Sequence, residues 1–134
     1  MTEPTVRERP LSPHLQIYRP MLTMVMSITN RITGGALYFG MGLLVLWLAA
    51  AAAGPDAFAT VQAVYGSWLG ILILIGFTCA LMLHTLAGIR HLIWDMGLGL
   101  DLRSIEWGAV AVLTGSIVLT IALWLYVLLR GSAT

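Results

Sequence analysis

The residues most able to do chemistry in this sequence are ionisable side chains at the end of a long apolar run. A helix advances about 100° per residue, so residues three or four apart share a face. Such a stripe carries His84, Gly88, His91 and Asp95, while Arg90 lies off it. Polar groups are costly at membrane depth, so the stripe is expected to face protein, water or a bound group. A histidine there can hydrogen-bond a neighbour, relay protons or ligate a metal.

The elements that position this stripe are predicted to be transmembrane helices. Of the 134 residues, 59% are apolar and 10% are charged, and the mean hydropathy is +0.91. Soluble domains carry roughly 25% charged residues. The net charge of +1 gives no reason to expect a nucleic-acid partner. We therefore predict an all-α integral membrane protein with a lipid bilayer around it.

Three apolar segments predict three membrane spans in a domain over residues 21–134, preceded by a polar arm over residues 1–20. The arm is rich in proline, which forbids a long helix, although a short amphipathic turn over residues 11–18 is compatible with it. The predicted spans are residues 23–54, 62–95 and 105–130. The first ends at a Gly54-Pro55-Asp56 turn signal.

Arginine distribution predicts the orientation of these spans. The arm and the start of the first span contain Arg7, Arg9, Arg19 and Arg31, and the second loop is flanked by Arg90 and Arg103. The first loop contains no basic residue. Positive charge favours the cytoplasmic side, so the N-terminus and the second loop are expected there. That orientation brings Ser27, Arg31, Arg90, His91 and Asp95 to the cytoplasmic face.

His84 is a candidate haem ligand, and Gly88 on the next turn would let a flat macrocycle lie close. His84 and His91 are about 10.5 Å apart along one helix face, so they cannot bind one iron from opposite sides. The other histidine, His14, lies in the arm. A six-coordinate haem therefore needs its second ligand from another chain or from a non-histidine side chain. The sequence has no Cys-x-x-Cys-His motif for covalent haem attachment.

Ser27 and Arg31 form a second candidate site, because their i, i+4 spacing places them on one face that Gly34 and Tyr38 continue. A hydroxyl and a guanidinium can donate hydrogen bonds to quinone carbonyls and stabilise negative charge during reduction. Asn30 is a further candidate at the edge of this face. The structural alternative is that Arg31 reaches the headgroups and Ser27 bonds a backbone carbonyl.

His91 and Arg90 also allow two interpretations each. His91 can hydrogen-bond a haem propionate, or it can pair on the surface with Asp95 at i+4. Arg90 can bind a propionate, or it can extend to the lipid headgroups.

Three segments together resemble the cytochrome b-type membrane-anchor subunit of succinate dehydrogenase. Residues 9–19 resemble its N-terminal signature, residues 27–34 its first-helix motif and residues 84–97 its haem-helix motif. They occur in the order of the family and cover nearly the whole chain. One departure is Asn30, where many members have a histidine, and asparagine cannot titrate.

The resemblance implies a subunit of respiratory complex II that is not catalytic alone. A flavoprotein subunit would oxidise succinate, and an iron–sulfur subunit would pass the electrons to the membrane. This chain and a second small anchor subunit would hold them there and share one haem b. His84 would be the axial metal ligand. Ser27 and Arg31 would line the ubiquinone pocket, and Arg31 and His91 would lie near the haem propionates. A multi-pass protein of the bacterial inner membrane is expected.

Three alternatives remain on sequence grounds. The first is a fumarate reductase-type anchor, in which electrons flow the other way. The second is a haem-free structural anchor, in which His84 is an interhelical hydrogen-bonding group. The third is a proton-coupled transporter that uses the ionisable residues as a relay, which predicts an inverted repeat or broken helices; the sequence contains no sign of either.

Overall fold

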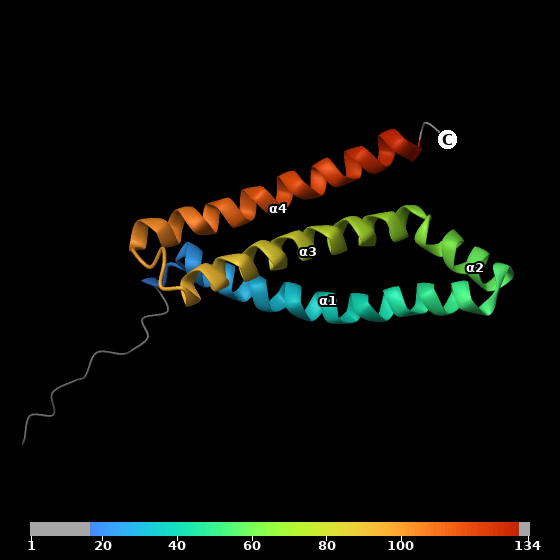
Figure 1. Ribbon diagram of the computed structural model, residues 1–134, viewed down its shortest axis with the longest axis horizontal. Helices are drawn as coiled ribbons and strands as arrows, with labels where there is room; N and C mark the ends of the chain where they lie inside the picture. The colour runs from blue at the N-terminus through green and yellow to red at the C-terminus, as the bar shows by residue number, and fades with distance from the viewer. Residues whose placement is uncertain (1–16, 132–134) are drawn as a thin grey trace, which may run out of the picture.

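A computed structural model describes residues 17–131 of the chain. Arg7, Arg9, His14 and most of the turn expected over residues 11–18 lie outside the described residues. Within them the chain is helical, and the elements follow one another along a folded-back path (Figure 1). They are α1 (Leu22–Ala53), α2 (Pro55–Tyr65), α3 (Trp68–Asp95) and α4 (Leu102–Gly131).

The three long helices confirm the predicted fold class. α1, α3 and α4 contain 32, 28 and 30 residues, and their mean hydropathies over the most apolar stretch are 2.0, 2.2 and 2.3. At about 1.5 Å per residue, each exceeds the hydrocarbon thickness of about 30 Å. Each is therefore long and apolar enough to cross a membrane.

The connection between the first two spans differs from the prediction. The second long helix begins at Trp68 and not near residue 62, because the Ser67 hydroxyl caps it by accepting a hydrogen bond from the Gly70 amide (3.1 Å). The preceding residues form the separate helix α2, which starts after Gly54. That glycine has φ +124°, a conformation that side chains disfavour.

The short helix α2 packs back against the end of α1. The Tyr65 hydroxyl donates to the Leu43 carbonyl (2.7 Å), and the Trp47 indole N–H donates to the Gln62 side chain (3.2 Å). The Trp47 and Phe58 rings meet edge to face at 5.5 Å. Trp and Tyr side chains are typical of membrane–water interfaces. The α1–α2 end of the bundle carries such side chains in Trp47 and Tyr65.

At the opposite end of the bundle, α4 begins at Leu102 instead of the predicted residue 105. The Asp101 carboxylate accepts a hydrogen bond from the Ser104 amide (2.9 Å) and so caps the first turn. Hydrogen bonds from the Ser104 side chain and amide lower the pKa of the Asp101 carboxyl. The cap is therefore fully present when the pH is above the ordinary carboxyl pKa. It is lost as the pH falls through the lowered pKa of Asp101.

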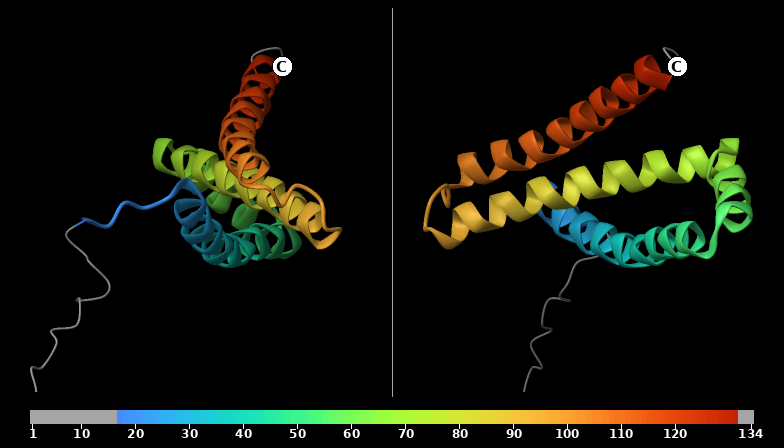
Figure 2. Two further views of the ribbon diagram at one scale, coloured as in Figure 1. Left: turned by 90° about the vertical axis from the view of Figure 1, so that its left-hand side faces the viewer. Right: turned by 45° about the vertical axis from the view of Figure 1, so that its right-hand side comes forward.

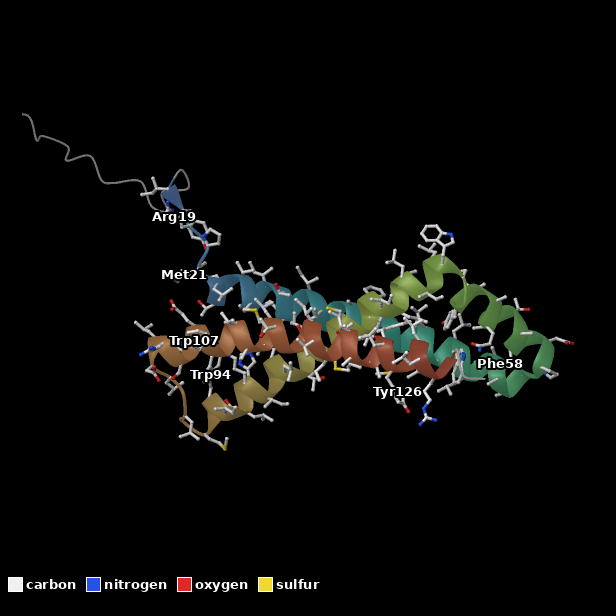
Figure 3. All side chains as sticks on the ribbon, turned by 90° about the horizontal axis from the view of Figure 1, so that it is seen from above. Arg19, Met21, Phe58, Trp94, Trp107 and Tyr126 are labelled. Atoms are coloured by element: carbon white, nitrogen blue, oxygen red, sulfur yellow. The ribbon has the colours of Figure 1, made fainter. Side chains whose placement is uncertain are left out.

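α3 lies between α1 and α4 and packs against both (Figures 1 and 2). Figure 3 shows Met21, Trp94 and Trp107 at one end of the bundle, where α1 starts, α3 ends and α4 starts; we call this the loop end. A small buried core lies among the three helices, and it consists of Met26, Leu83, Ala87, Ala109 and Val112. Most other large apolar side chains are exposed, as suits contact with lipid or with another membrane chain.

The Phe77 ring of α3 packs directly against α1 at Gly40. A Cβ atom placed there would overlap the Phe77 ring, so a larger residue cannot fit without displacing the ring. Glycine at such positions lets transmembrane helices pack with their backbones close together. Gly42, two residues later on α1, has no neighbouring atom within 4 Å of a built Cβ.

We predict that Gly40→Ala lowers the unfolding temperature of the protein in mild detergent, while Gly42→Ala leaves it unchanged or raises it. Overpacking costs about 1–3 kcal/mol, whereas alanine favours a helix over glycine by up to about 1 kcal/mol. Thermal unfolding followed by circular dichroism provides the measurement. Equal effects at both positions would contradict the close α1–α3 contact.

Candidate functional site

A groove of about 430 Å³ lies between α1 and α3 at the loop end. Its base is formed by Met26 and Ala87, which both belong to the buried core. Polar side chains surround this apolar base. The groove is lined by Thr23, Met26, Ser27, Asn30 and Arg31 from α1 and by Ala87, Arg90, His91 and Trp94 from α3.

Three predicted site residues come together in this groove. Ser27 and Arg31 lie on the α1 side, and His91 lies on the α3 side. A second hollow of about 380 Å³ follows α1, and Ser27 and Arg31 line that one too. The lining of both hollows includes guanidinium groups and hydroxyls but no carboxylate. The groove is thus suited to a group that accepts hydrogen bonds and carries or develops negative charge.

His84 lies deeper in the bundle, against α1. Its Nδ1 atom is 3.4 Å from the Thr33 hydroxyl oxygen. That hydroxyl is itself placed to donate its proton to the Thr29 carbonyl (2.9 Å) or the Asn30 carbonyl (3.0 Å). Because the proton is used there, the oxygen is left to accept a hydrogen bond from His84 Nδ1–H. In the neutral tautomer that carries its proton on Nδ1, the ring has an unprotonated Nε2.

An unprotonated Nε2 is the form in which a histidine ligates a metal. Gly34 lets the ring lie against α1, because a Cβ there would be 3.1 Å from the His84 Cε1 atom. Gly88 lies one turn further along α3. A Cβ atom placed there would have no neighbouring side chain or other helix within 4 Å, so this space is open. The Nε2 atom of His84 as a metal donor and the open space beside Gly88 fit a flat iron-bearing macrocycle.

His84 does not belong to a cluster of metal-binding side chains in the described part of the chain. Within residues 17–131, no group of three or more histidine, cysteine, aspartate or glutamate side chains could hold a metal ion. His91 is two helical turns away, lines the groove and meets the Trp94 ring edge to face at 5.1 Å. In the described part of the chain, no hydrogen bond or ion pair joins His91 to Asp95, so the predicted surface pair is not formed.

Arg90 lies in the groove with Ser27, Arg31 and His91, as the sequence predicted, but its contact with Trp94 was not expected. Its guanidinium carbon lies 4.1 Å from the centre of the Trp94 ring, and its Nη2 donates to the Ile105 carbonyl of α4 (2.8 Å). The side chain therefore lines the groove and does not extend to the headgroups. Gly108 leaves room for it, since a Cβ there would be 3.2 Å from Arg90 Nε.

Two buried polar atoms around the groove have no hydrogen-bond partner among the described residues. They are Asn30 Oδ1 and Arg90 Nε. Unpaired buried polar atoms are uncommon and costly. They mark this end of the bundle as a place where a bound group or another chain would supply partners.

A family model described as "Succinate dehydrogenase/Fumarate reductase transmembrane subunit" matches residues 5–123. The match includes all three predicted motifs and all four predicted site residues. It thus covers the whole groove and the His84 environment.

Several curated proteins are similar to the chain over most of its length. The succinate dehydrogenase cytochrome b556 subunit of Paracoccus denitrificans is 49% identical over 113 residues, which are 84% of this chain and 87% of that protein. The subunit of the same name from Rickettsia typhi is 36% identical over 117 residues (87% and 91%). The mitochondrial succinate dehydrogenase cytochrome b560 subunit of Sus scrofa is 40% identical over 120 residues (86% and 69%).

We predict that Thr33→Val shifts the tautomer balance of His84. The variant keeps the shape of the side chain but removes the oxygen that accepts from Nδ1–H, a contact worth about 1 kcal/mol. Nitrogen NMR shifts of labelled histidine report the tautomer directly. The measurement uses haem-free protein, in which no metal is bound to the ring. Thr29→Val is the matched control, because the Thr29 hydroxyl donates to the Val25 carbonyl (2.8 Å). An unchanged His84 spectrum in Thr33→Val would contradict the assignment.

Proposed function

Because the chain belongs to the succinate dehydrogenase/fumarate reductase transmembrane subunit family, we propose that it binds one haem b together with a second anchor subunit and forms part of a ubiquinone-reduction site. The observation that carries the proposal is the arrangement at the loop end. The His84 ring, whose Nδ1 lies 3.4 Å from the Thr33 hydroxyl, is one helical turn from a groove lined by cationic and hydroxyl donors.

His84 is the proposed haem ligand. The cytochrome b names of the relatives imply a haem, and the Thr33 contact supports a ring nitrogen free to bind iron. A b-type haem, when bound, supplies a site that takes up and releases one electron. His91, two turns away on the same helix, could not bind the same iron, so we expect a second ligand to be supplied by the second anchor subunit. His91 and Arg31 are placed in the groove, where they can hydrogen-bond the propionates.

Ser27 and Arg31 are the proposed quinone-binding residues. The Ser27 hydroxyl and the Arg31 guanidinium donate hydrogen bonds to a quinone carbonyl, and Arg31 stabilises the negative charge that grows on its oxygen as electrons arrive. Reduction to the quinol takes two electrons and two protons. The Asn30 amide can hydrogen-bond the quinone and hold its ring in place, but it cannot deliver a proton.

The partners follow from the same proposal. A flavoprotein subunit oxidises succinate, and an iron–sulfur subunit carries the electrons to the loop end. The exposed apolar side chains of α1 and α4 leave ample surface for the second anchor subunit and for lipid. The arginine pattern supports a cytoplasmic N-terminus in a bacterial inner membrane, which places the groove on the cytoplasmic side. The succinate dehydrogenase names of the relatives favour this direction of electron flow over fumarate reduction.

We predict that His84→Ala abolishes the b-type band in the reduced-minus-oxidised optical spectrum of the membrane complex. His91→Gln should retain the band, because His91 contacts only the periphery of the haem. The band is measured per mole of complex, quantified by an antibody to the flavoprotein subunit. A full-strength band in His84→Ala would refute haem ligation by this residue, and the absence of a band in the unmodified protein would favour a haem-free anchor.

We predict that Arg31→Leu lowers succinate–ubiquinone reductase activity by at least about tenfold, because loss of one charge-stabilising donor in other enzymes costs about 10²–10³-fold. Succinate oxidation with an artificial acceptor should remain, since it bypasses the groove. Arg103→Leu removes an arginine from the first turn of α4, outside the groove, and serves as the control. Unchanged activity and unchanged quinone KM in Arg31→Leu would overturn the quinone site.

A further inference from the structure

Trp94 is a groove residue to which neither the sequence motifs nor the proposed function gives a role. Its half-buried indole is in contact with Arg90 and His91, the two other polar side chains that α3 contributes to the groove. The Arg90 guanidinium lies over the ring at 4.1 Å, and the His91 ring meets it edge to face at 5.1 Å with an angle of 82° between the planes. Its own N–H donates to the Gly99 carbonyl (3.2 Å).

The loop after α3 fixes this indole. Gly97 and Gly99 have φ values of +75° and +68°, which side chains rarely adopt. The Gly97 amide bonds the Trp94 carbonyl (2.8 Å), so the loop turns back and presents the Gly99 carbonyl to the indole N–H. Trp94 is thereby attached to the loop at one edge, and it lines the groove. Figure 3 shows Trp94 at the loop end of the bundle.

Arg90 depends on this ring for its position. One of its donors is occupied by the Ile105 carbonyl, whereas its buried Nε has no partner among the described residues. An arginine near the end of a membrane helix would otherwise extend toward the headgroups. The cation–π contact and the Ile105 hydrogen bond keep the charge at the groove instead. A cation on α3 thus shares the groove with Arg31 on α1, and no carboxylate lines it.

We propose that Trp94 is a positioning residue that holds the Arg90 guanidinium at the groove, so that two arginines stabilise the charge that develops on a bound quinone. This inference rests on the proposed quinone site and adds to it a second cation and the residue that fixes it. A neutral quinone gains little from the extra charge when it binds. The benefit appears as electrons arrive, so the contact acts on kcat more than on KM.

The test uses the whole complex in membranes, with ubiquinone reduction by succinate as the assay. Trp94→Leu is expected to lower kcat about tenfold, the equivalent of about 1.4 kcal/mol, while the quinone KM stays within about twofold. Trp94→Phe keeps an aromatic face for the guanidinium and should retain kcat within about threefold. Trp124→Leu is the matched control, because Trp124 is also half-buried and donates one hydrogen bond, to Thr78 (3.3 Å), away from the groove. It should leave kcat and KM unchanged.

A double-mutant cycle separates positioning from general packing. If Trp94 acts through Arg90, Trp94→Leu in an Arg90→Leu background should lower kcat no further. Arg90→Lys keeps the charge but loses the planar group that stacks on the indole, so it should reproduce the kcat loss of Trp94→Leu. This variant also tests the inference if Trp94→Leu fails to assemble. The b-type band per mole of complex should be unchanged in every variant compared.

Several results would overturn the inference. They are additive kcat losses in the double variant, a raised KM with unchanged kcat in Trp94→Leu, and equal losses in Trp94→Phe and Trp94→Leu. Arg31→Leu is measured in parallel. If Arg31→Leu is impaired while Trp94→Leu and Arg90→Lys behave as the unmodified complex, the role of Trp94 is refuted and the quinone site stands. If Arg31→Leu is unaffected, the quinone site itself is refuted.

Discussion

The contact between Thr33 and His84 is the interaction on which the rest of this structure depends. An imidazole inside an apolar bundle needs a hydrogen-bond partner, because an unpaired polar group is costly there. Thr33 can meet that need in a specific way, since its own proton is placed to bond the α1 backbone and its oxygen can then accept from Nδ1–H. The contact joins α1 to α3 at this register. When the ring carries its proton on Nδ1, Nε2 keeps the free lone pair that the proposed haem requires.

The groove at the loop end follows from the same register. Once α1 and α3 are aligned at Thr33 and His84, the residues one and two turns nearer the loop end must face one another. Met26 and Ala87 fill the base with small and flexible apolar groups, and the polar side chains of Ser27, Arg31 and His91 lie around it. The buried hydrophobic core lies toward the loop end, while much of the remaining apolar surface is left for lipid and for other chains.

The sequence predicted the three spans, because the length of the apolar runs determines them. It predicted the grouping of Ser27, Arg31, Arg90 and His91 from the distribution of arginines, although Asp95, expected with them, does not line the groove. It did not predict α2, since a short helix between a glycine turn and a serine cap has too few periodic positions to be recognised. The positions of Thr33 and Trp94 were also missed. Periodicity indicates which residues share a face of one helix. The role of Thr33 depends on its contact with His84 on another helix, which periodicity does not indicate. Ser67 as the cap of α3 and Asp101 as the cap of α4 are missed features that the sequence itself could have indicated.

The central claim, that His84 binds one side of a haem whose other side is held by another chain, can be tested through the iron itself. The complex is assembled from this chain carrying nitrogen-15 histidine and from unlabelled partner subunits, and the oxidised haem is examined by pulsed electron paramagnetic resonance. The account predicts one strongly coupled nitrogen-15 imidazole, with the second axial nitrogen unlabelled. Two labelled ligands on the iron, or none, would contradict it.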